Sequence, residues 1–262
     1  MINKTDVKRI VVKVGTSTLT YDTGKINIRR MSKLAQVLSD LKNAGIEVTL
    51  VTSGAIGFGV GKLGLKERPK DTPGRQAAAT VGQCELMFLY DKFFGEYGNI
   101  TGQLLVTKDD FENEERHKNL HNSFMKLFEY GAIPIVNEND SVAVEEIVFG
   151  DNDSLSAHVA KIVDADTLII LTDIDGLFSA NPREDENAYL IHSIDEITDD
   201  ILALAGGTGT NRGTGGMITK LHAAQIATAA GINTVVMNGN DPEDIYKLID
   251  GRQIGTLFKA AR

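Results

Sequence analysis

Residues 10–17 read Ile-Val-Val-Lys-Val-Gly-Thr-Ser, an apolar and β-branched run that ends at a glycine. Alternate residues of a strand face opposite ways, so apolar side chains lie on both faces of this run, and Lys13 shares a face with Val11. A strand that is apolar on both faces is typical of a parallel sheet covered by helices on each side. The run therefore predicts a central strand of an α/β domain.

Similar short runs recur along the chain and alternate with helical patterns. The predicted strands are Ile10–Val14, Glu47–Thr52, Ile100–Val106, Ala132–Val136, Thr167–Leu171 and Ile232–Met237. The predicted helices are Ile28–Ala44, with Asn27 as N-cap and Gly45 at its end, Arg75–Tyr97, Lys118–Tyr130, Asp153–Val163 and Met217–Ala230. This alternation predicts a mostly parallel sheet with helices on both faces. Two segments, Ser141–Gly150 and Ala180–His192, break it and are predicted to be hairpins or excursions.

The composition is that of a globular protein: 262 residues, 42% of them hydrophobic. The formal net charge of −9 argues against nonspecific nucleic-acid binding, which needs a basic patch. We expect a cytoplasmic protein without membrane contact, because no signal-peptide pattern or bilayer-length apolar run is present. The single cysteine, Cys84, is expected to be a reduced core residue. No linker or repeat divides the chain, which predicts one domain over residues 1–262 with two lobes that meet near residue 165.

In an open α/β sheet, ligands bind beyond the carboxyl ends of the strands. Lys13 lies at such an end. A lysine there loses its hydration unless an anion meets it, which suits a phosphate ligand. Its stem would equally pack while the ammonium group reaches water, and at this position alone both interpretations stay open.

The turn after the second predicted strand, residues 52–56, reads Thr-Ser-Gly-Ala-Ile. Small residues that enter a helix expose backbone N–H groups at the positive end of the helix dipole, which suits a carboxylate or phosphate. In isolation, an ordinary turn with Ser53 as N-cap is the favoured interpretation. Nearby, Gly59, Gly61 and Gly64 have the spacing of a dinucleotide-binding fingerprint. We reject that motif because it must begin directly at a strand end.

Two polar clusters lie in the middle of the chain. Residues 137–141, Asn-Glu-Asn-Asp-Ser, follow a predicted strand. They suit amino-acid recognition, because amides bind carboxylate oxygens and an acid binds an ammonium group, although a polar turn equally explains them. Residues 150–154, Gly-Asp-Asn-Asp-Ser, enter the helix Asp153–Val163 and would either cap it or place two aspartates near a metal.

A glycine-rich loop, residues 206–216, leads into the helix Met217–Ala230. Side chains on a helix lean toward its N-terminus, so Lys220 would lean back over the loop. Free N–H groups, a helix dipole and a lysine together form a phosphate cradle. A plain surface loop explains the glycines but not the lysine, so the sequence favours phosphate binding here.

Phosphoryl transfer to a carboxylate fits these groups. The transfer needs in-line positioning and neutralisation of charge more than covalent chemistry from the protein. A carboxylate acceptor is already ionised at neutral pH, so it needs no strong base. Two lysines and magnesium would bring this anion up to ATP.

Several segments, in their order along the chain, resemble the amino acid kinase family, in particular its members that phosphorylate glutamate. They are Lys13–Ser17, Val51–Ile56, Asn137–Asp140, Gly150–Asp153, Leu171–Asp173 with Gly176–Leu177, and Gly213–Lys220. The resemblance covers nearly the whole chain. It implies ATP-dependent phosphorylation of the side-chain carboxylate of L-glutamate to L-glutamyl 5-phosphate, the first step of proline biosynthesis. It also implies a three-layer αβα sandwich with a mainly parallel sheet of about eight strands.

By motif position, the resemblance implies a role for each candidate residue. The catalytic residues would be Lys13 and Lys220, which stabilise the transferring phosphoryl group, and Asp153, which orients them. Glutamate would be bound in the N-terminal lobe by Ser53, Gly54, Asn137, Asp140 and Asn152. ATP would be bound in the lobe from about residue 165 by Lys13, Thr172, Asp173, Thr214, Gly215, Gly216, Met217, Ile218, Thr219 and Lys220. Mg²⁺ would accompany ATP, bound mainly through phosphates and water and without a metal site in the protein.

The resemblance further implies a homo-oligomer, a dimer or tetramer, and feedback inhibition by proline at or near the glutamate site. Many family members carry a C-terminal domain of the kind found in RNA-modifying enzymes, whereas this chain ends at Arg262, so a short form is expected. Two alternatives remain. Another carboxylate or carbamate kinase of the superfamily is disfavoured by Asp140, which suits a free ammonium group. A non-catalytic amino-acid sensor on the same fold would not need both Lys13 and Lys220.

Overall fold

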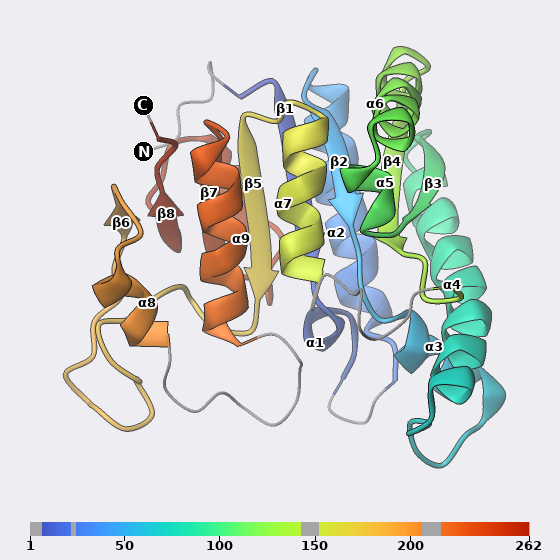
Figure 1. The fold of residues 1–262 in the computed structure, drawn as a ribbon, viewed down its shortest axis with the longest axis horizontal. Coiled ribbons are helices and arrows are strands. Elements are labelled where there is room, and N and C mark those ends of the chain that lie inside the picture. Colours follow the sequence, from blue (N-terminus) through green and yellow to red (C-terminus); the bar gives the residue numbers. More distant parts are fainter. Residues whose placement is uncertain (1–6, 22–24, 143–151, 206–215, 262) are drawn as a thin grey trace.

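An eight-stranded sheet lies between two layers of helices (Figure 1). The computed structural model describes residues 7–21, 25–142, 152–205 and 216–261. The strands are β1 (Arg9–Val14), β2 (Glu47–Val51), β3 (Ile100–Val106), β4 (Ala132–Glu138), β5 (Thr167–Thr172), β6 (Ser193–Ile194), β7 (Asn233–Asn238) and β8 (Thr256–Phe258). Their order in the sheet is β3-β4-β2-β1-β5-β7-β8-β6, and every neighbouring pair is parallel except β7 with β8.

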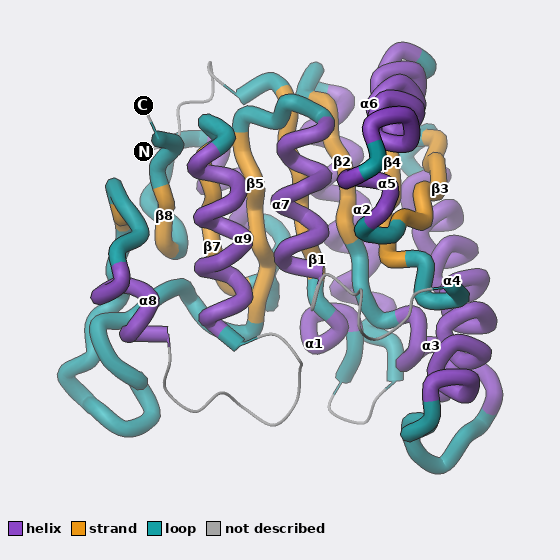
Figure 2. Tube along the Cα trace, viewed as in Figure 1, coloured by secondary structure: helices purple, strands orange, loops and turns teal. Residues whose placement is uncertain are grey.

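Helices cover both faces of this sheet (Figure 2). They are α1 (Thr16–Leu19), α2 (Ile28–Asn43), α3 (Ala55–Leu63), α4 (Thr72–Gly95), α5 (Asp109–Glu112), α6 (Glu114–Glu129), α7 (Asn152–Ile162), α8 (Asp199–Ala205), α9 (Met217–Ala229) and α10 (Asp244–Ile249). Val12 of β1 packs in a core with α2, α4 and α10, and Val11 packs on the opposite face in a core with α6, α7 and α9. The predicted three-layer αβα sandwich is confirmed.

Local signals place most element ends where the sequence predicts them. The Asn27 side chain caps α2 by accepting a hydrogen bond from the backbone N–H of Arg30. Gly45 follows that helix with a φ of 97°, a conformation that favours glycine. The helix predicted from Arg75 begins earlier, because Asp71 caps α4 by accepting from the backbone N–H of Gly74.

The two predicted excursions have different outcomes. Most of Ser141–Gly150 lies outside the described residues. The excursion Ala180–His192 is confirmed, and an antiparallel bridge between Phe178 and Leu190 closes it. Among the described residues, no helix has both the length and the apolar character to cross a membrane.

The prediction that Cys84 is a core residue is wrong, because its side chain is exposed on α4. The buried stripe of this helix passes through Gln83, Leu86 and Tyr90, which lie three and four positions apart. Cys84 lies on the outer side with Phe88, which is also exposed. Because apolar residues lie on both faces of α4, the sequence does not show which face is buried.

The glycines that imitate a dinucleotide fingerprint lie in α3 and at its end, so the rejection of that motif is confirmed. Gly59 serves packing instead: a Cβ atom there would lie 1.7 Å from the carbonyl oxygen of Ala78 in α4. Gly82 makes the matching contact, where a Cβ atom would lie 1.7 Å from the carbonyl oxygen of Ala55. The backbones of α3 and α4 therefore touch directly.

We expect Gly59→Ala to lower the free energy of unfolding by about 3 kcal/mol, because the added methyl group forces the two helices apart. Gly61→Ala is the matched control in α3, where a Cβ atom meets no heavy atom of the described residues within 4 Å. It should gain about 0.5–1 kcal/mol from helix propensity. Urea unfolding of both variants measures the difference, and equal stabilities would contradict the proposed contact.

Candidate active site

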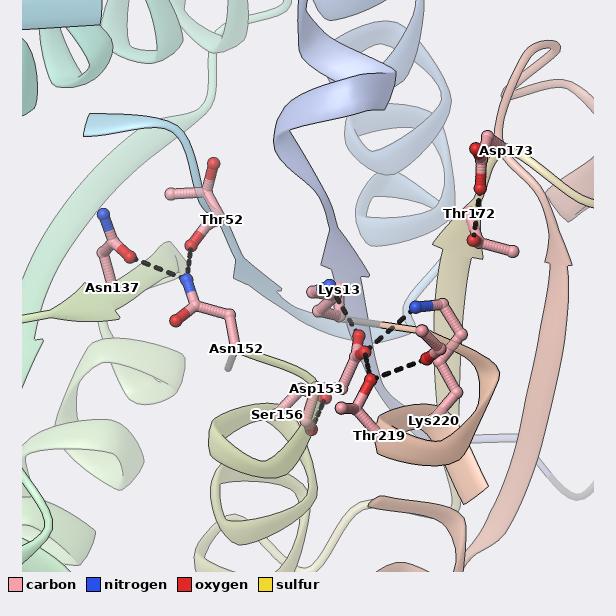
Figure 3. Close-up of polar contacts among 11 residues, drawn as sticks. Lys13, Thr52, Asn137, Asn152, Asp153, Ser156, Thr172, Asp173, Thr219 and Lys220 are labelled. Carbon is pink, nitrogen blue, oxygen red and sulfur yellow. Dashed lines mark hydrogen bonds and ion pairs between the residues drawn. The ribbon is translucent and has the colours of Figure 1, made fainter. Parts of the chain in front are cut away.

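Three charged side chains meet beyond the carboxyl end of β1 (Figure 3). Lys13 points to the sheet face that α7 and α9 cover, and Asp153 and Lys220 lie in the first turns of those two helices. The Nζ atom of Lys13 is 2.5 Å from Asp153 Oδ1, and that of Lys220 is 3.1 Å from Asp153 Oδ2. All three side chains are buried. The Lys13 ammonium group therefore meets an anionic partner within the protein, as a lysine at this strand end requires.

The electrostatics of this triad favour an anionic ligand. Burial by itself would raise the pKa of Asp153, but the positive charges of Lys13 and Lys220, with hydrogen bonds from Lys13 and Thr219, lower it to about 2. Asp153 is therefore ionised at neutral pH. The triad itself holds two ammonium groups against one carboxylate, and this positive balance suits a phosphate or carboxylate ligand.

Thr219 and Gly216 join the start of α9 to the triad. The Thr219 hydroxyl oxygen lies 2.8 Å from Asp153 Oδ2 and 2.8 Å from the carbonyl oxygen of Gly216. Gly216 is the N-cap of α9 and offers no side-chain cap. Met217 and Ile218 complete the first turn, whose backbone N–H groups lie at the positive end of the helix dipole. Thr214 and Gly215, predicted to bind ATP, lie outside the described residues.

A second polar cluster lies beside the triad and consists of amides. Asn137 is the second-last residue of β4, and Asn152 begins α7 directly before Asp153. The Nδ2 atom of Asn152 donates hydrogen bonds to Asn137 Oδ1, at 2.8 Å, and to the carbonyl oxygen of Thr52, at 2.5 Å. The cluster thereby ties the ends of β2 and β4 to the start of α7 (Figure 3).

Two acidic side chains follow this cluster on β4 and its turn. Burial, followed by the charge of Asp140, raises the pKa of Glu138 to about 7. Burial also raises the pKa of Asp140, and the charge of Arg68 partly offsets that effect. Asp140 has no hydrogen bond in the described part of the chain. Two half-buried carboxyl groups at one place suit a positively charged ligand group.

The turn after β2 differs from its favoured sequence interpretation. Gly54, not Ser53, is the N-cap of α3, and it adopts a φ of 102° that favours glycine. No side chain caps this helix, so the interpretation of Ser53 as N-cap is wrong. The half-buried Ser53 and the uncapped N–H groups of α3 lie next to Thr52, whose carbonyl oxygen binds the amide cluster. This turn is thus available to a carboxylate or phosphate.

Thr172 and Asp173 lie at the carboxyl end of β5, apart from the other candidates (Figure 3). The Thr172 hydroxyl donates to Asp173 Oδ1 at 3.1 Å. Among the described residues, no hydrogen bond links this pair to the triad. No group of three or more His, Cys, Asp or Glu side chains in the described ranges could hold a metal ion.

Two residues of the site are absent from the sequence prediction. Gln83 of α4 binds Asn137, and the Tyr90 hydroxyl group lies 2.9 Å from that of Thr52. Burial raises the pKa of Tyr90, so its hydroxyl group is protonated at neutral pH. Gln83 and Tyr90 lie seven residues apart on the same helical stripe as Leu86, so the sequence pattern predicts two core residues. The available signal of a role in the site was the presence of a polar glutamine within this stripe.

Comparisons with known proteins show which family the chain belongs to. The model of the amino acid kinase family matches residues 8–238. The glutamate 5-kinase of Clostridium perfringens is 53% identical over 261 residues, which cover 98% of this chain and 97% of that protein. That of Listeria monocytogenes is 53% identical over 97% of this chain and 94% of that protein. That of Caldanaerobacter subterraneus is 52% identical over 95% of this chain but 67% of that longer protein.

Solved structures show the same fold at low sequence identity. An isopentenyl phosphate kinase from T. acidophilum, in complex with its product, has a TM-score of 0.66 and 17% identity over 96% of this chain and 100% of that one. A UMP kinase from Bacillus anthracis has a TM-score of 0.66 and 15% identity over 98% of this chain and 97% of that one. Both likenesses cover nearly the whole chain and show its fold.

Proposed function

Because this chain belongs to the amino acid kinase family, and within it to the glutamate 5-kinases, we propose that it transfers the γ-phosphoryl group of ATP to the side-chain carboxylate of L-glutamate. The products would be L-glutamyl 5-phosphate and ADP, in the first step of proline biosynthesis. The resemblance seen in the sequence motifs is confirmed at the level of the family. The observation that carries the proposal is the buried Lys13–Asp153–Lys220 triad.

In the proposed reaction, the two lysines bind the phosphoryl group while it moves between two anions. Lys13 comes from a strand end and Lys220 from a helix start, so they approach the phosphoryl group from different elements. Asp153 holds both ammonium groups in place and reduces their mutual repulsion. Mg²⁺, bound through the ATP phosphates and water, would add neutralising charge. A carboxylate acceptor needs no base, so the protein supplies position and charge.

The amino-acid substrate fits the cluster on the β2 and β4 side. Asp140, with Glu138 beside it, would bind the ammonium group, and Asn137 and Asn152 would supply amide contacts. Ser53 and Gly54 at the uncapped start of α3 would bind a substrate carboxylate. The ammonium group is the feature that separates free glutamate from acylated glutamate.

The nucleotide fits the opposite side, at the ends of β5 and α9. Thr172 and Asp173 would face the nucleotide, and residues from Thr214 to Lys220 would surround its phosphates. Under this proposal, glutamate occupies the N-terminal lobe and ATP the lobe from about residue 165. We further propose a cytoplasmic homo-oligomer, a dimer or tetramer, inhibited by proline at or near the glutamate site.

An ADP-release assay over a panel of acceptors tests the substrate. We expect turnover with L-glutamate and none with N-acetylglutamate, carbamate or a nucleoside monophosphate, because only glutamate brings a free ammonium group to Asp140. ADP release with N-acetylglutamate but not with glutamate would contradict the proposal in favour of a related carboxylate kinase. Binding of glutamate without ADP release from any acceptor would support the sensor alternative.

We expect the KM for glutamate to rise roughly three- to tenfold as the pH falls from about 8 to about 6. With a pKa of about 7, Glu138 is mostly ionised at the higher pH and mostly neutral at the lower, so one negative charge near the ammonium group is lost. Steady-state kinetics of wild type and Glu138→Gln check this, because the variant cannot titrate at that position. A slope that is identical in both proteins would contradict the role of Glu138.

A further inference from the structure

Gln83 belongs to the amide cluster, yet the proposed reaction does not use it. Its side chain is 8% exposed. The Oε1 atom accepts a hydrogen bond from Asn137 Nδ2 at 2.8 Å, whereas Nε2 is buried and has no hydrogen-bond partner among the described residues. Buried amide groups are normally satisfied at both ends. Burying Nε2 without a partner costs free energy, so we look for the role of Gln83 in the hydrogen bond that Oε1 accepts from Asn137.

The contact between α3 and α4 determines where Gln83 lies. Gly82, the residue before it, allows the α4 backbone to approach the carbonyl oxygen of Ala55. Ala55 is the first residue of α3, directly after Ser53 and Gly54. This close approach brings the part of α4 that carries Gln83 next to the turn proposed to bind the substrate carboxylate.

The orientation of the Asn137 amide follows from its neighbours. Its Oδ1 atom accepts one hydrogen bond from the backbone N–H of Glu138, at 2.9 Å, and another from Asn152 Nδ2, at 2.8 Å. Oδ1 is thus an acceptor twice, and Nδ2 is the atom that remains to face Gln83. Gln83 must then present Oε1, as it does. An acceptor at position 83 therefore locks the Asn137 amide in one orientation.

The same chain of bonds fixes the Asn152 amide. Both hydrogens of Asn152 Nδ2 are used, one on the carbonyl oxygen of Thr52 and one on Asn137 Oδ1. Its Oδ1 atom is turned away from both partners (Figure 3). Asn152 therefore offers a ligand only an acceptor. An acceptor suits an ammonium group and does not suit a carboxylate.

We propose that Gln83 is a positioning residue for the amino-acid substrate: through Asn137 it holds Asn152 with Oδ1 facing the substrate ammonium group. This inference rests on the proposed function, because it takes an amino acid as the ligand. Without an acceptor at position 83, Asn137 Nδ2 loses its partner in the core, and the amide is left with the two bonds to Oδ1. We expect the Asn137 side chain then to shift so that Nδ2 meets another acceptor, which loosens the bond to Asn152 and moves Asn152 Oδ1 away from the ammonium group.

Three variants test this role. Gln83→Leu keeps an apolar stem but removes the acceptor, and we expect the KM for glutamate to rise at least tenfold while kcat and the KM for ATP stay within twofold. Gln83→Glu keeps an oxygen that accepts from Asn137 Nδ2, so its KM should stay within threefold of wild type. Gln253→Leu, the same substitution at an exposed position between α10 and β8, is the control and should change nothing.

Glutarate separates a positioning role from a merely structural one, because it has both carboxylates of glutamate but no ammonium group. Measured as a competitive inhibitor against glutamate, glutarate should bind wild type and Gln83→Leu within twofold of each other. A KM for glutamate within twofold of wild type in Gln83→Leu would overturn the proposal. An equal loss in Gln83→Glu, or an equal loss of glutarate affinity, would also overturn it.

Failure of the proposed function is recognised separately. If wild type releases no ADP with glutamate, calorimetric titration of glutamate and glutarate replaces the kinetic measurement. The loss in Gln83→Leu is then expected in the dissociation constant for glutamate alone, and equal affinities in the two proteins would overturn the role of Gln83.

Discussion

Replacing Lys220 by Ala is expected to lower kcat by at least about 10³-fold while L-glutamate still binds. Lys220 is a buried cation held by Asp153 at the start of α9, so its removal takes away one of the two lysine charges that meet the phosphoryl group. Loss of one such charge in phosphoryl transfer costs about 10³- to 10⁵-fold in rate. The assay is ADP release at saturating glutamate and ATP, with glutamate affinity measured by calorimetry.

Lys220→Met separates loss of charge from loss of packing, because methionine keeps the length of the buried stem. It should be as inactive as Lys220→Ala. Lys247→Ala is the control on α10, where an exposed lysine pairs with Asp244 at 2.5 Å, and it should keep wild-type activity. Turnover in Lys220→Met close to that of wild type would contradict the proposed role of the Lys220 charge in phosphoryl transfer.

Asp153→Asn is expected to lower both activity and stability. Asp153 is 0% exposed and contacts two buried lysines, so its neutralisation removes the negative charge that both ammonium groups share. Breaking a buried ion pair typically costs about 3–5 kcal/mol of unfolding free energy. The lysines would also move apart, and kcat should fall by at least about 10²-fold.

The pH dependence of that stability loss has a defined sign. The folded pKa of Asp153, about 2, lies below its value of about 3.9 in the unfolded chain. The carboxylate therefore stabilises the fold at neutral pH, and this contribution is lost as the pH falls toward 2. The unfolding free energies of wild type and Asp153→Asn, measured in urea, should differ most at about pH 7, and the difference should shrink below about pH 4 and vanish at about pH 2 or lower.

Asp164→Asn provides the control for this pair of measurements. Asp164 is exposed just after α7 with a φ of 50°, a conformation that asparagine tolerates well. Its unfolding free energy should stay within about 0.5 kcal/mol of wild type. If Asp153→Asn were as stable and as active as this control, the claim that Asp153 balances the charges of Lys13 and Lys220 would be contradicted.

The parts of the fold that follow from local pattern could be predicted from the sequence. The strand at Ile10–Val14 and the helix cap at Asn27 depend on residues that are neighbours in the chain. Lys220 could be placed because side chains on a helix lean toward its N-terminus. The role of each lysine in catalysis stays a prediction until the variants above are measured.

Other features depend on contacts between distant segments and left little trace in the sequence. Which face of α4 is buried was ambiguous, because apolar residues such as Phe88 lie on its exposed side, and Cys84 was misplaced for that reason. The amide cluster joins residues 83, 137 and 152 from three elements, so only the folded chain shows which of its donors are used. Short elements such as α10 and β8 also give too few residues for a periodic signal.

Trapping of the product tests the central claim, that the site phosphorylates the side-chain carboxylate of L-glutamate. An acyl phosphate reacts with hydroxylamine to give a hydroxamate and releases phosphate. With the protein, ATP, Mg²⁺, L-glutamate and hydroxylamine, we predict one molecule of glutamate 5-hydroxamate for each ADP released, identified by mass spectrometry. ADP release without a hydroxamate, or a hydroxamate on the α-carboxylate, would contradict the claim.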